Sequence, residues 1–243
     1  MDNPFISVRK YIKWGDEPRG ENTNTLVLTA RSKHFVDIRI FNDLPLPDDP
    51  DDKTAIQRLE WASPIPSKLS WAGEILKPAH AIWTHWIDST TTSPVKDEGD
   101  MYPQSDGTVL EYGIMANPKT GKMTKYEECW EDVEPALVGD EEEFVSWVLI
   151  CDDAESGTKG MLIRIGEIIQ GLVRTPKGIS VVRWEWNANA ETEEEAEWER
   201  AVAIGRLEVP GILFEEGENI VKGVELMGSD GLDWLCVEAF EWS

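Results

Sequence analysis

Basic residues are scarce in this sequence. The 243 residues include 23 Lys and Arg against 47 Asp and Glu, so the formal net charge is −24 at pH 7. A surface of this charge repels the phosphates of nucleic acids and the headgroups of anionic lipids. We therefore expect neither nucleic acid nor a membrane surface as a direct ligand.

Long hydrophobic runs are also lacking. The longest stretch without Asp, Glu, Lys or Arg is the ten residues 78–87, whereas a membrane-spanning helix needs about 20 apolar residues. Asp2, Arg9 and Lys10 interrupt the N-terminal region before the apolar run of a signal peptide can form. The sequence predicts no membrane insertion and a cytoplasmic and nuclear location.

Cysteine and histidine are few. The cysteines are Cys129, Cys151 and Cys236. They form no C-x-x-C pair, which favours free thiols in a reducing compartment. The closest histidines, His80 and His85, are five residues apart and would point to opposite faces of a strand. No nucleophile elbow or phosphate-binding loop is present. We predict a non-enzymatic protein with no catalytic residue, no cofactor and no metal.

What is present is a series of short segments rich in β-branched and aromatic residues, separated by Gly, Pro, Asn or Asp, which is typical of strands and turns. The expected strands are residues 5–14, 25–29, 34–41, 80–87, 108–115, 123–130, 144–151, 159–165, 168–174, 179–186, 200–207, 212–214, 219–227 and 234–241. Short helices are expected at 54–61, after a capping-box pattern, and at 192–199. Residues 43–52 and 89–107 are expected to be loops.

An internal repeat divides the chain. A shift of 110 residues aligns Gly107, Gly113, Gly121, Glu128 and Glu131 with Gly217, Gly223, Gly231, Glu238 and Glu241. Upstream, residues 83–86 resemble 183–186, and residues 5–8 resemble 144–147. We infer a mainly β fold of two tandem, related antiparallel β-barrel domains, residues 1–138 and 139–243.

Twelve tryptophans are several times the usual share for a chain of this length. Trp83, Trp86, Trp184 and Trp186 fall in expected strands, and the last two share one face of their strand. Three readings stay open. The rings plug the barrels, they line a lumen that holds a small apolar ligand, or they form an exposed protein-binding patch.

Several segments resemble the fungal HRI family. They are residues 3–18, 21–28, 35–39, 59–62, 83–88 and 238–242, so the resemblance extends over essentially the whole chain. The resemblance implies two related β-barrel domains of lipocalin-like character in a non-enzymatic cytoplasmic and nuclear protein. It also implies partners, namely a casein kinase I type kinase and the post-translational translocation machinery of the endoplasmic reticulum.

Our leading hypothesis is an interaction protein whose acidic loops dock on a basic protein partner. The residues expected to make this contact are Asp48, Asp49, Asp51, Asp52, Glu193, Glu194 and Glu195. The alternative is a lipocalin-like carrier that binds a small apolar ligand in a lumen lined by tryptophans. An exposed strand edge could also support a homodimer.

Overall fold

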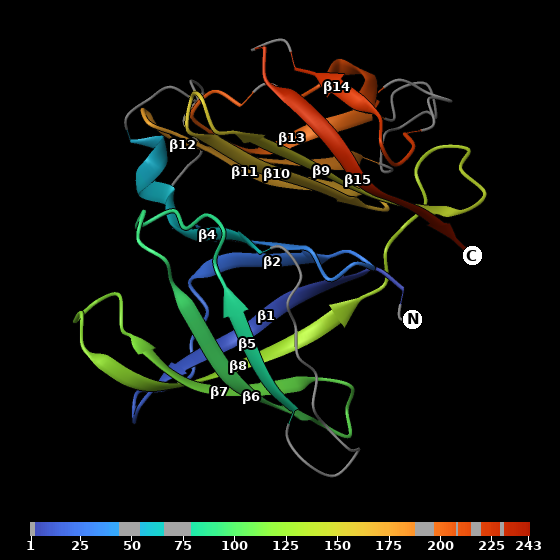
Figure 1. Cartoon of the computed structure of the whole chain (residues 1–243). Helices are drawn as coiled ribbons and strands as arrows, with labels where there is room; N and C mark the ends of the chain where they lie inside the picture. Colours follow the sequence, from blue (N-terminus) through green and yellow to red (C-terminus); the bar gives the residue numbers. More distant parts are fainter. Residues whose placement is uncertain are drawn as a thin grey trace.

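The computed structural model describes residues 3–43, 54–65, 79–187, 197–207, 209–214, 220–228 and 231–243. In this part of the chain strands dominate, and every strand pair is antiparallel. The strands form two sheets, one above the other (Figure 1). This confirms the expected mainly β, antiparallel fold, and the two expected barrel units correspond to two sheets.

The first sheet has eight strands. Their spatial order is β4 (Leu59–Ile65), β3 (Phe35–Phe41), β2 (Thr23–Thr29), β1 (Phe5–Trp14), β8 (Met123–Val133), β7 (Val109–Ala116), β6 (Lys96–Pro103) and β5 (Ala79–Thr84). The second sheet has seven strands. Their order is β13 (Glu197–Ile204), β12 (Gly178–Asn187), β11 (Ile168–Thr175), β10 (Thr158–Ile165), β9 (Phe144–Asp153), β15 (Asp233–Trp242) and β14 (Glu225–Met227).

The first sheet curls so that its two edge strands, β4 and β5, approach each other (Figure 1). No strand ladder joins these edges in the described ranges. Instead, Ser89, which follows β5, donates its backbone N–H to the carbonyl of Ala62 in β4 over 3.0 Å. The first sheet is therefore a curled half-barrel, and the second sheet is open at β13 and β14.

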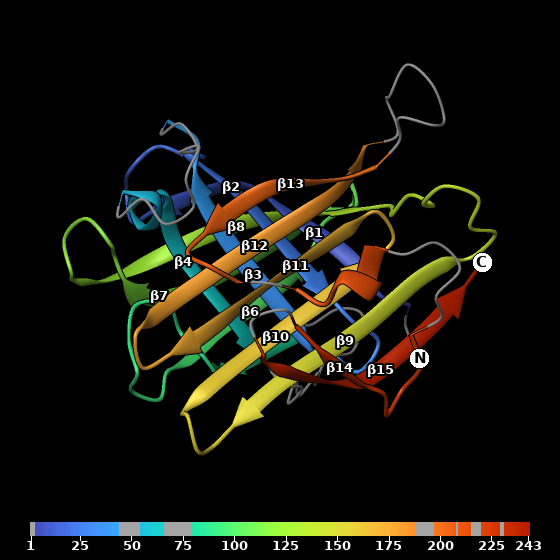
Figure 2. The ribbon, with the colours of Figure 1, turned by 90° about the horizontal axis from the view of Figure 1, so that it is seen from above.

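The apolar core lies between the two sheets. Leu28 and Ile38 of the first sheet and Val148, Ile163 and Leu172 of the second belong to this cluster, and each is 0% exposed. Seen from above, β10 and β11 run across β3 and β4 (Figure 2). Because each sheet covers the apolar face of the other, the two halves of the chain share one core.

A second apolar cluster covers the opposite face of the second sheet. It includes Trp147 and Leu162 from the sheet and Leu213 from the 3-10 helix η3 (Gly211–Phe214). The second sheet is thus buried on both faces, which explains why β10 and β11 read as nearly continuous apolar runs.

Several local expectations were wrong. The helix expected at 54–61 is a single 3-10 turn, η1 (Ala55–Arg58), and Thr54 makes no side-chain cap hydrogen bond. The chain then enters β4, because Trp61 alternates with the buried Ala62 and pairs with β3. The strand expected at 212–214 is η3.

The loop expected at 89–107 contains β6, whose sequence is too charged to read as a strand. It forms because β5 and β7 supply backbone partners on both sides while its outer face stays in water. Of the helix expected at 192–199, residues 197–199 lie in β13 and the others lie outside the described residues. In the described ranges no helix is long and apolar enough to cross a bilayer.

The two sheets divide the sequence between β8, which ends at Val133, and β9, which begins at Phe144. In each sheet the first strand pairs with the last, β1 with β8 and β9 with β15. The repeated windows correspond to the hairpins β7–β8 and β14–β15. In contrast, the similar blocks 83–86 and 183–186 occupy different positions, since β5 is an edge strand and β12 is not.

Candidate functional site

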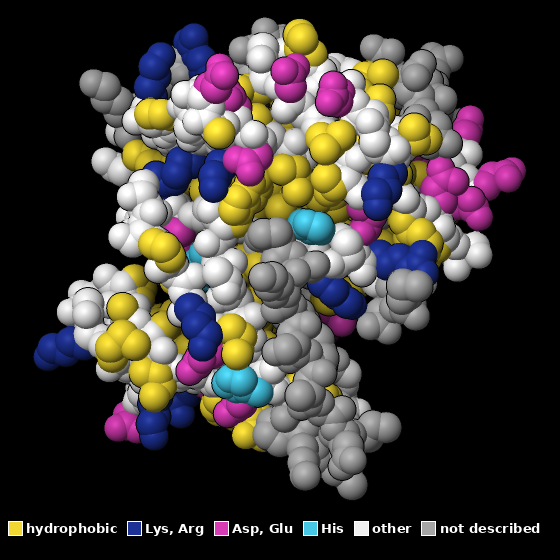
Figure 3. All heavy atoms as spheres, viewed as in Figure 1, with side chains coloured by type: hydrophobic (Ala, Val, Ile, Leu, Met, Phe, Trp, Pro, Cys, Tyr) yellow, Lys and Arg dark blue, Asp and Glu magenta, His cyan; other side chains and the backbone are white. Residues whose placement is uncertain are grey.

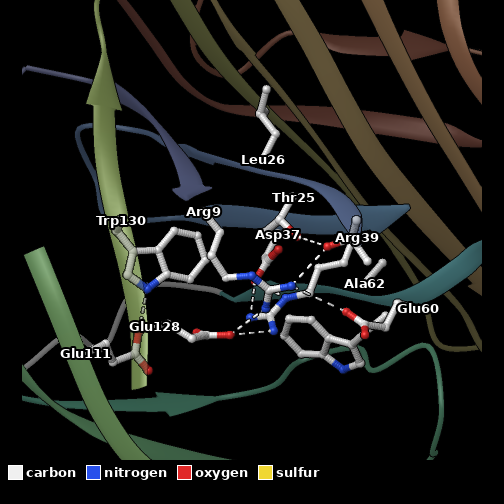
Figure 4. Close-up of polar contacts among 12 residues, drawn as sticks. Arg9, Thr25, Leu26, Asp37, Arg39, Glu60, Ala62, Glu111, Glu128 and Trp130 are labelled. Atoms are coloured by element: carbon white, nitrogen blue, oxygen red, sulfur yellow. Dashed lines mark hydrogen bonds and ion pairs between the residues drawn. The ribbon is translucent and has the colours of Figure 1, made fainter. Parts of the chain in front are cut away.

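The candidate site is the concave interior of the curled first sheet. Along β2 and β3 the residues alternate, so that Leu26 and Ile38 face the core between the sheets while Thr25, Asp37 and Arg39 face the interior. Because side chains of a strand alternate between its faces, the same strands that build the apolar core also build a polar lining. Figure 4 shows these polar side chains converging.

Two arginines lie at the centre of the interior, the buried Arg9 and the half-buried Arg39 (Figure 4). Arg9 Nη1 is 2.5 Å from Glu128 Oε1, and Arg39 Nη1 is 3.1 Å from the same oxygen. Arg39 also pairs with Asp37 at 2.9 Å, and Arg9 pairs with Glu21 at 2.7 Å. The side chains of Arg9 and Glu128 are each 1% exposed. One carboxylate from β8 therefore joins the guanidinium groups of β1 and β3.

Glu111 of β7 lies next to this ion network. Tyr126 donates its hydroxyl to Glu111 Oε1 over 2.6 Å, and Trp130 donates its indole N–H to Oε2 over 2.9 Å. Burial, followed by the charge of Glu128, raises the pKa of Glu111 to about 8. At neutral pH Glu111 is therefore mostly a neutral acid.

Burial also raises the pKa of Asp37, against the opposing effect of Arg39. One oxygen of Asp37, Oδ1, is buried without a hydrogen-bond partner in the described part of the protein. Burial likewise raises the pKa of Glu60. The interior therefore holds more carboxyl groups than its two arginines can neutralise, and protonation relieves part of the excess.

Two glycines make room for these side chains. A Cβ atom at Gly113 would overlap the ring of Tyr126, and one at Gly99 would lie 3.0 Å from Glu111 Cγ. Both are in strands β6 and β7, whose inner faces contact the polar cluster. The cluster is therefore closely packed from the side of β6 and β7.

Asp88 closes the seam between β4 and β5. Its carboxylate accepts hydrogen bonds from Trp61 Nε1 and His85 Nδ1, each over 2.9 Å, and from Thr90 Oγ1 over 2.6 Å. Burial opposes ionisation, but these donors, led by His85, lower the pKa of Asp88. Asp88 is thus a stable anion that ties the loop after β5 to β4.

Chemically, the interior is an ion and hydrogen-bond network rather than an apolar lumen. The guanidinium groups already donate hydrogen bonds to the carboxyl groups of the same interior. No group of three or more His, Cys, Asp or Glu that could hold a metal ion occurs in the described ranges. A ligand would have to break buried ion pairs to enter, which costs several kcal/mol (about 3–5) per pair broken.

The four tryptophans expected to line a lumen lie in separate places. Trp83 is half-buried on β5 opposite Asp97 of β6, whereas Trp86 packs against the core between the sheets. Trp184 and Trp186 share a face of β12 as expected, but they lie on the far side of the second sheet. The structure does not bring the four rings around one cavity.

Trp184 and Trp186 contact other aromatic rings instead. The ring centroids of Trp184 and Phe214 are 4.6 Å apart, and those of Trp186 and Trp198 are 5.8 Å apart in an edge-to-face arrangement. Such pairs stabilise a fold beyond their buried area. In these contacts the rings fill space in the second sheet's outer cluster.

A pocket of about 320 Å³ lies beside β9 and β15. Val145, Ile220, Lys222, Ala239 and Glu241 are among the residues that line it. None of the four tryptophans contributes to it. The seven acidic residues expected to dock a partner, at 48, 49, 51, 52 and 193–195, lie outside the described residues.

The polar interior was not anticipated from the sequence, although a signal for it exists. Residues 36–40 read Val-Asp-Ile-Arg-Ile and residues 6–9 read Ile-Ser-Val-Arg. In both, charged or polar residues alternate with apolar ones, as a strand with one polar face requires. The pattern alone does not say whether that face meets water or an enclosed interior.

Comparisons with known proteins agree with this architecture. A family model described as Protein HRI1 matches residues 5–238. The crystal structure of the uncharacterized protein YLR301w from Saccharomyces cerevisiae is similar in fold, with a TM-score of 0.75 and 20% sequence identity over 98% of this chain and 100% of that one. No curated protein matches. With the family model extending over nearly the whole of both sheets, the chain belongs to the HRI1 family.

Proposed function

We propose that this chain is a non-enzymatic interaction protein that docks an acidic surface on a basic protein partner. The partners implied by the family resemblance are a casein kinase I type kinase and the translocation machinery of the endoplasmic reticulum. The ion-paired interior of the first sheet supports an interaction role over a carrier role, since an apolar ligand would have to displace paired charges.

The observation that carries the proposal is an acidic surface at one end of the second sheet. We call it the acidic rim; its members are Asp140, Glu142, Glu143, Glu185, Glu197 and Glu199. Figure 3 shows carboxylates gathered over the connection between β8 and β9, which contains the first three. A Cβ atom at Gly139 would lie 3.8 Å from the Trp186 ring, which places this connection against the end of β12.

The acidic rim places like charges opposite one another. Glu185 of β12 and Glu199 of β13 are direct cross-strand partners, and the next pair is Trp186 with Trp198. Like charges at such positions destabilise a sheet. A basic partner would relieve this repulsion. The half-buried Trp186 and Trp198 point to the opposite face of the same two strands.

The expected docking residues are close to the acidic rim in the sequence. Glu193, Glu194 and Glu195 belong to the connection from β12 to β13, which starts where the described part of β12 ends at Asn187. Two independent lines of reasoning, loop composition and the geometry of the flanking strands, therefore favour the same end of the second sheet.

The proposal is tested by neutralising the acidic rim. We expect the triple substitution E185Q/E197Q/E199Q to weaken binding to a purified casein kinase I type kinase about tenfold or more at low salt, and high salt to remove the difference. The matched control is D152N/D153N/E155Q, which removes the same charge from exposed positions at the other end of β9. Titration calorimetry gives both affinities.

If both variants lose affinity for the kinase to the same extent, net charge rather than the acidic rim drives association. Binding that is insensitive to both variants and to salt would refute acidic docking altogether. If the unmodified protein binds neither the kinase nor purified translocation components, the partners implied by the family are wrong for this chain.

A further inference from the structure

The hairpin formed by β7 and β8 interrupts the acidic character of the chain. Residues 112–126 contain three lysines and no carboxylate, in a protein with 47 Asp and Glu among 243 residues. The lysines are Lys119, Lys122 and Lys125, and all three are exposed. This hairpin is therefore a basic element on an acidic molecule.

The inner face of the hairpin points to the polar interior, so its outer face is defined. Glu111 and Tyr126 are buried on the inner side. On the outer side Tyr112, Ile114 and Met123 are 39%, 55% and 68% exposed. These three residues form an apolar strip along the outer face of the hairpin.

The lysines border this strip. Lys125 is the cross-strand partner of Ile114, and Met123 is the partner of Ala116 at the end of the hairpin. Figure 3 shows hydrophobic side chains with Lys or Arg beside them at the lower left, where the tip of β7 and β8 lies in Figure 1. Apolar side chains with a charged border are typical of protein interaction sites.

The three lysines make no ion pair within the described residues. By contrast, Lys10, Arg19 and Lys96 on the same sheet each pair with a glutamate at 2.7–2.9 Å. In a protein with twice as many acids as bases, three adjacent cations without an internal partner leave their charge available to another molecule.

The turn that presents two of the lysines is ordered by its own hydrogen bonds. Asn117 is 3% exposed, and its side-chain oxygen accepts the backbone N–H of Lys119 over 2.9 Å. The backbone N–H of Gly121, at a φ of +65°, donates to the carbonyl of Asn117 over 2.7 Å. A preorganised turn reduces the entropy cost of binding.

One carboxylate on the outer face, Glu127, is already paired with a cation. Glu127, the cross-strand partner of Tyr112, accepts hydrogen bonds from Arg19 Nη2 and from the hydroxyl of Tyr11, each over 2.8 Å. Its side chain is 14% exposed. Glu127 therefore contributes little negative charge to the surface beside the lysines.

We propose that the outer face of the β7–β8 hairpin, comprising Tyr112, Ile114, Met123, Lys119, Lys122 and Lys125, docks an acidic protein segment that also carries apolar side chains. Charge complementarity indicates the kind of segment that binds. The unpaired lysines favour carboxylates in that segment, and the apolar strip favours apolar side chains between those carboxylates. This surface is opposite in sign to the acidic rim and does not depend on the function proposed for it.

The test uses two fluorescent peptides of equal length, one alternating Glu with Leu and Phe and one with Lys in place of every Glu. We expect the acidic peptide alone to bind the full chain. The substitution K119Q/K122Q/K125Q should weaken the affinity for the acidic peptide about tenfold or more, and I114S/M123S should have a similar effect. The control K159Q/K177Q/K222Q removes the same charge elsewhere and should leave the affinity within about twofold.

Fluorescence anisotropy measures these affinities, and hydrogen exchange should show protection at 112–125. Absence of binding by the unmodified chain, or equal weakening by the control, overturns the proposal. It is also overturned if the lysine variant loses self-association or binding to phosphatidylserine vesicles while peptide affinity is unchanged, since a second copy or an anionic membrane would then be the occupant.

Discussion

At the centre of the curled sheet one carboxylate, Glu128, compensates two guanidinium groups, those of the buried Arg9 and the half-buried Arg39. The three side chains come from β1, β3 and β8, which are far apart in the sequence. Burying such charges costs several kcal/mol each, so the arrangement persists only when every member is paired. The polar interior is therefore the place where single substitutions act most strongly.

Replacing Glu128 with Gln should destabilise the fold by about 3–5 kcal/mol, because Arg9 and Arg39 would share a site without the anion between them. Urea unfolding followed by tryptophan fluorescence measures the change. Glu131→Gln is the matched control, since Glu131 pairs with Lys10 on the surface with both side chains about half exposed. Its effect should stay within about 1 kcal/mol, and similar losses for both variants would contradict a special role of Glu128.

Glu111 should make stability depend on pH. Its pKa is raised from 4.5 to about 8 in the folded protein, so between these values the folded state binds more protons than the unfolded state. The contribution of Glu111 to stability is therefore present at low pH and is lost as the pH rises through about 8.

Glu111→Gln should flatten this loss, because the amide, like the neutral acid, is uncharged and does not ionise, and its oxygen can still accept a hydrogen bond from Tyr126 or Trp130. Unfolding free energies at several pH values from 5 to 9 give the slopes for both proteins. If the two curves run parallel throughout this range, Glu111 does not carry the raised pKa.

Among the elements, β6 and β7 depend on glycine for their close approach to the polar interior. Gly113→Ala should cost about 1–3 kcal/mol, since the added Cβ overlaps the Tyr126 ring and this ring is 3% exposed. Gly20→Ala adds the same methyl group where nothing lies within 4 Å, and its effect should stay within about 0.5 kcal/mol. Thermal unfolding compares the two variants. Equal shifts in the unfolding temperature would show that the change in backbone freedom, not the clash with Tyr126, determines the effect.

Over the whole molecule, the shared core couples the two sheets. Gln170 of β11 adds a polar link, because its amide donates to the carbonyls of Leu26 and Val36 over 3.0 and 2.8 Å. Its oxygen accepts a hydrogen bond from Arg183 Nε over 3.0 Å. Neither sheet can separate from the other without exposing Leu28 and Ile38 and leaving these groups unpaired.

We therefore expect residues 1–138 not to fold alone. The isolated fragment should lack a cooperative thermal transition and bind a hydrophobic dye, whereas the full chain should unfold in a single transition that includes both sheets. Calorimetry and dye fluorescence test this. A soluble, monomeric fragment with its own sharp transition would show instead that the two repeated halves are independent domains.

The sequence by itself determined the class of the fold. Short β-branched segments between turn residues placed strands such as β1 and β10 within a residue of their observed ends, since local patterning reports strands well. It also indicated membership in the family that the comparisons support. It missed β4 and β6, because their formation depends on neighbours that supply backbone hydrogen bonds rather than on their own composition.

Only the tertiary structure decided what the strands enclose. The alternation in β2 and β3 predicts two unlike faces, but the curl of the first sheet turned the polar face inward and the stacking of the second sheet covered the apolar one. The same stacking placed Trp86 in the shared core and Trp184 in a separate cluster. Whether a strand face lies against water, charged side chains or another sheet depends on contacts between distant segments. The local sequence pattern does not predict those contacts.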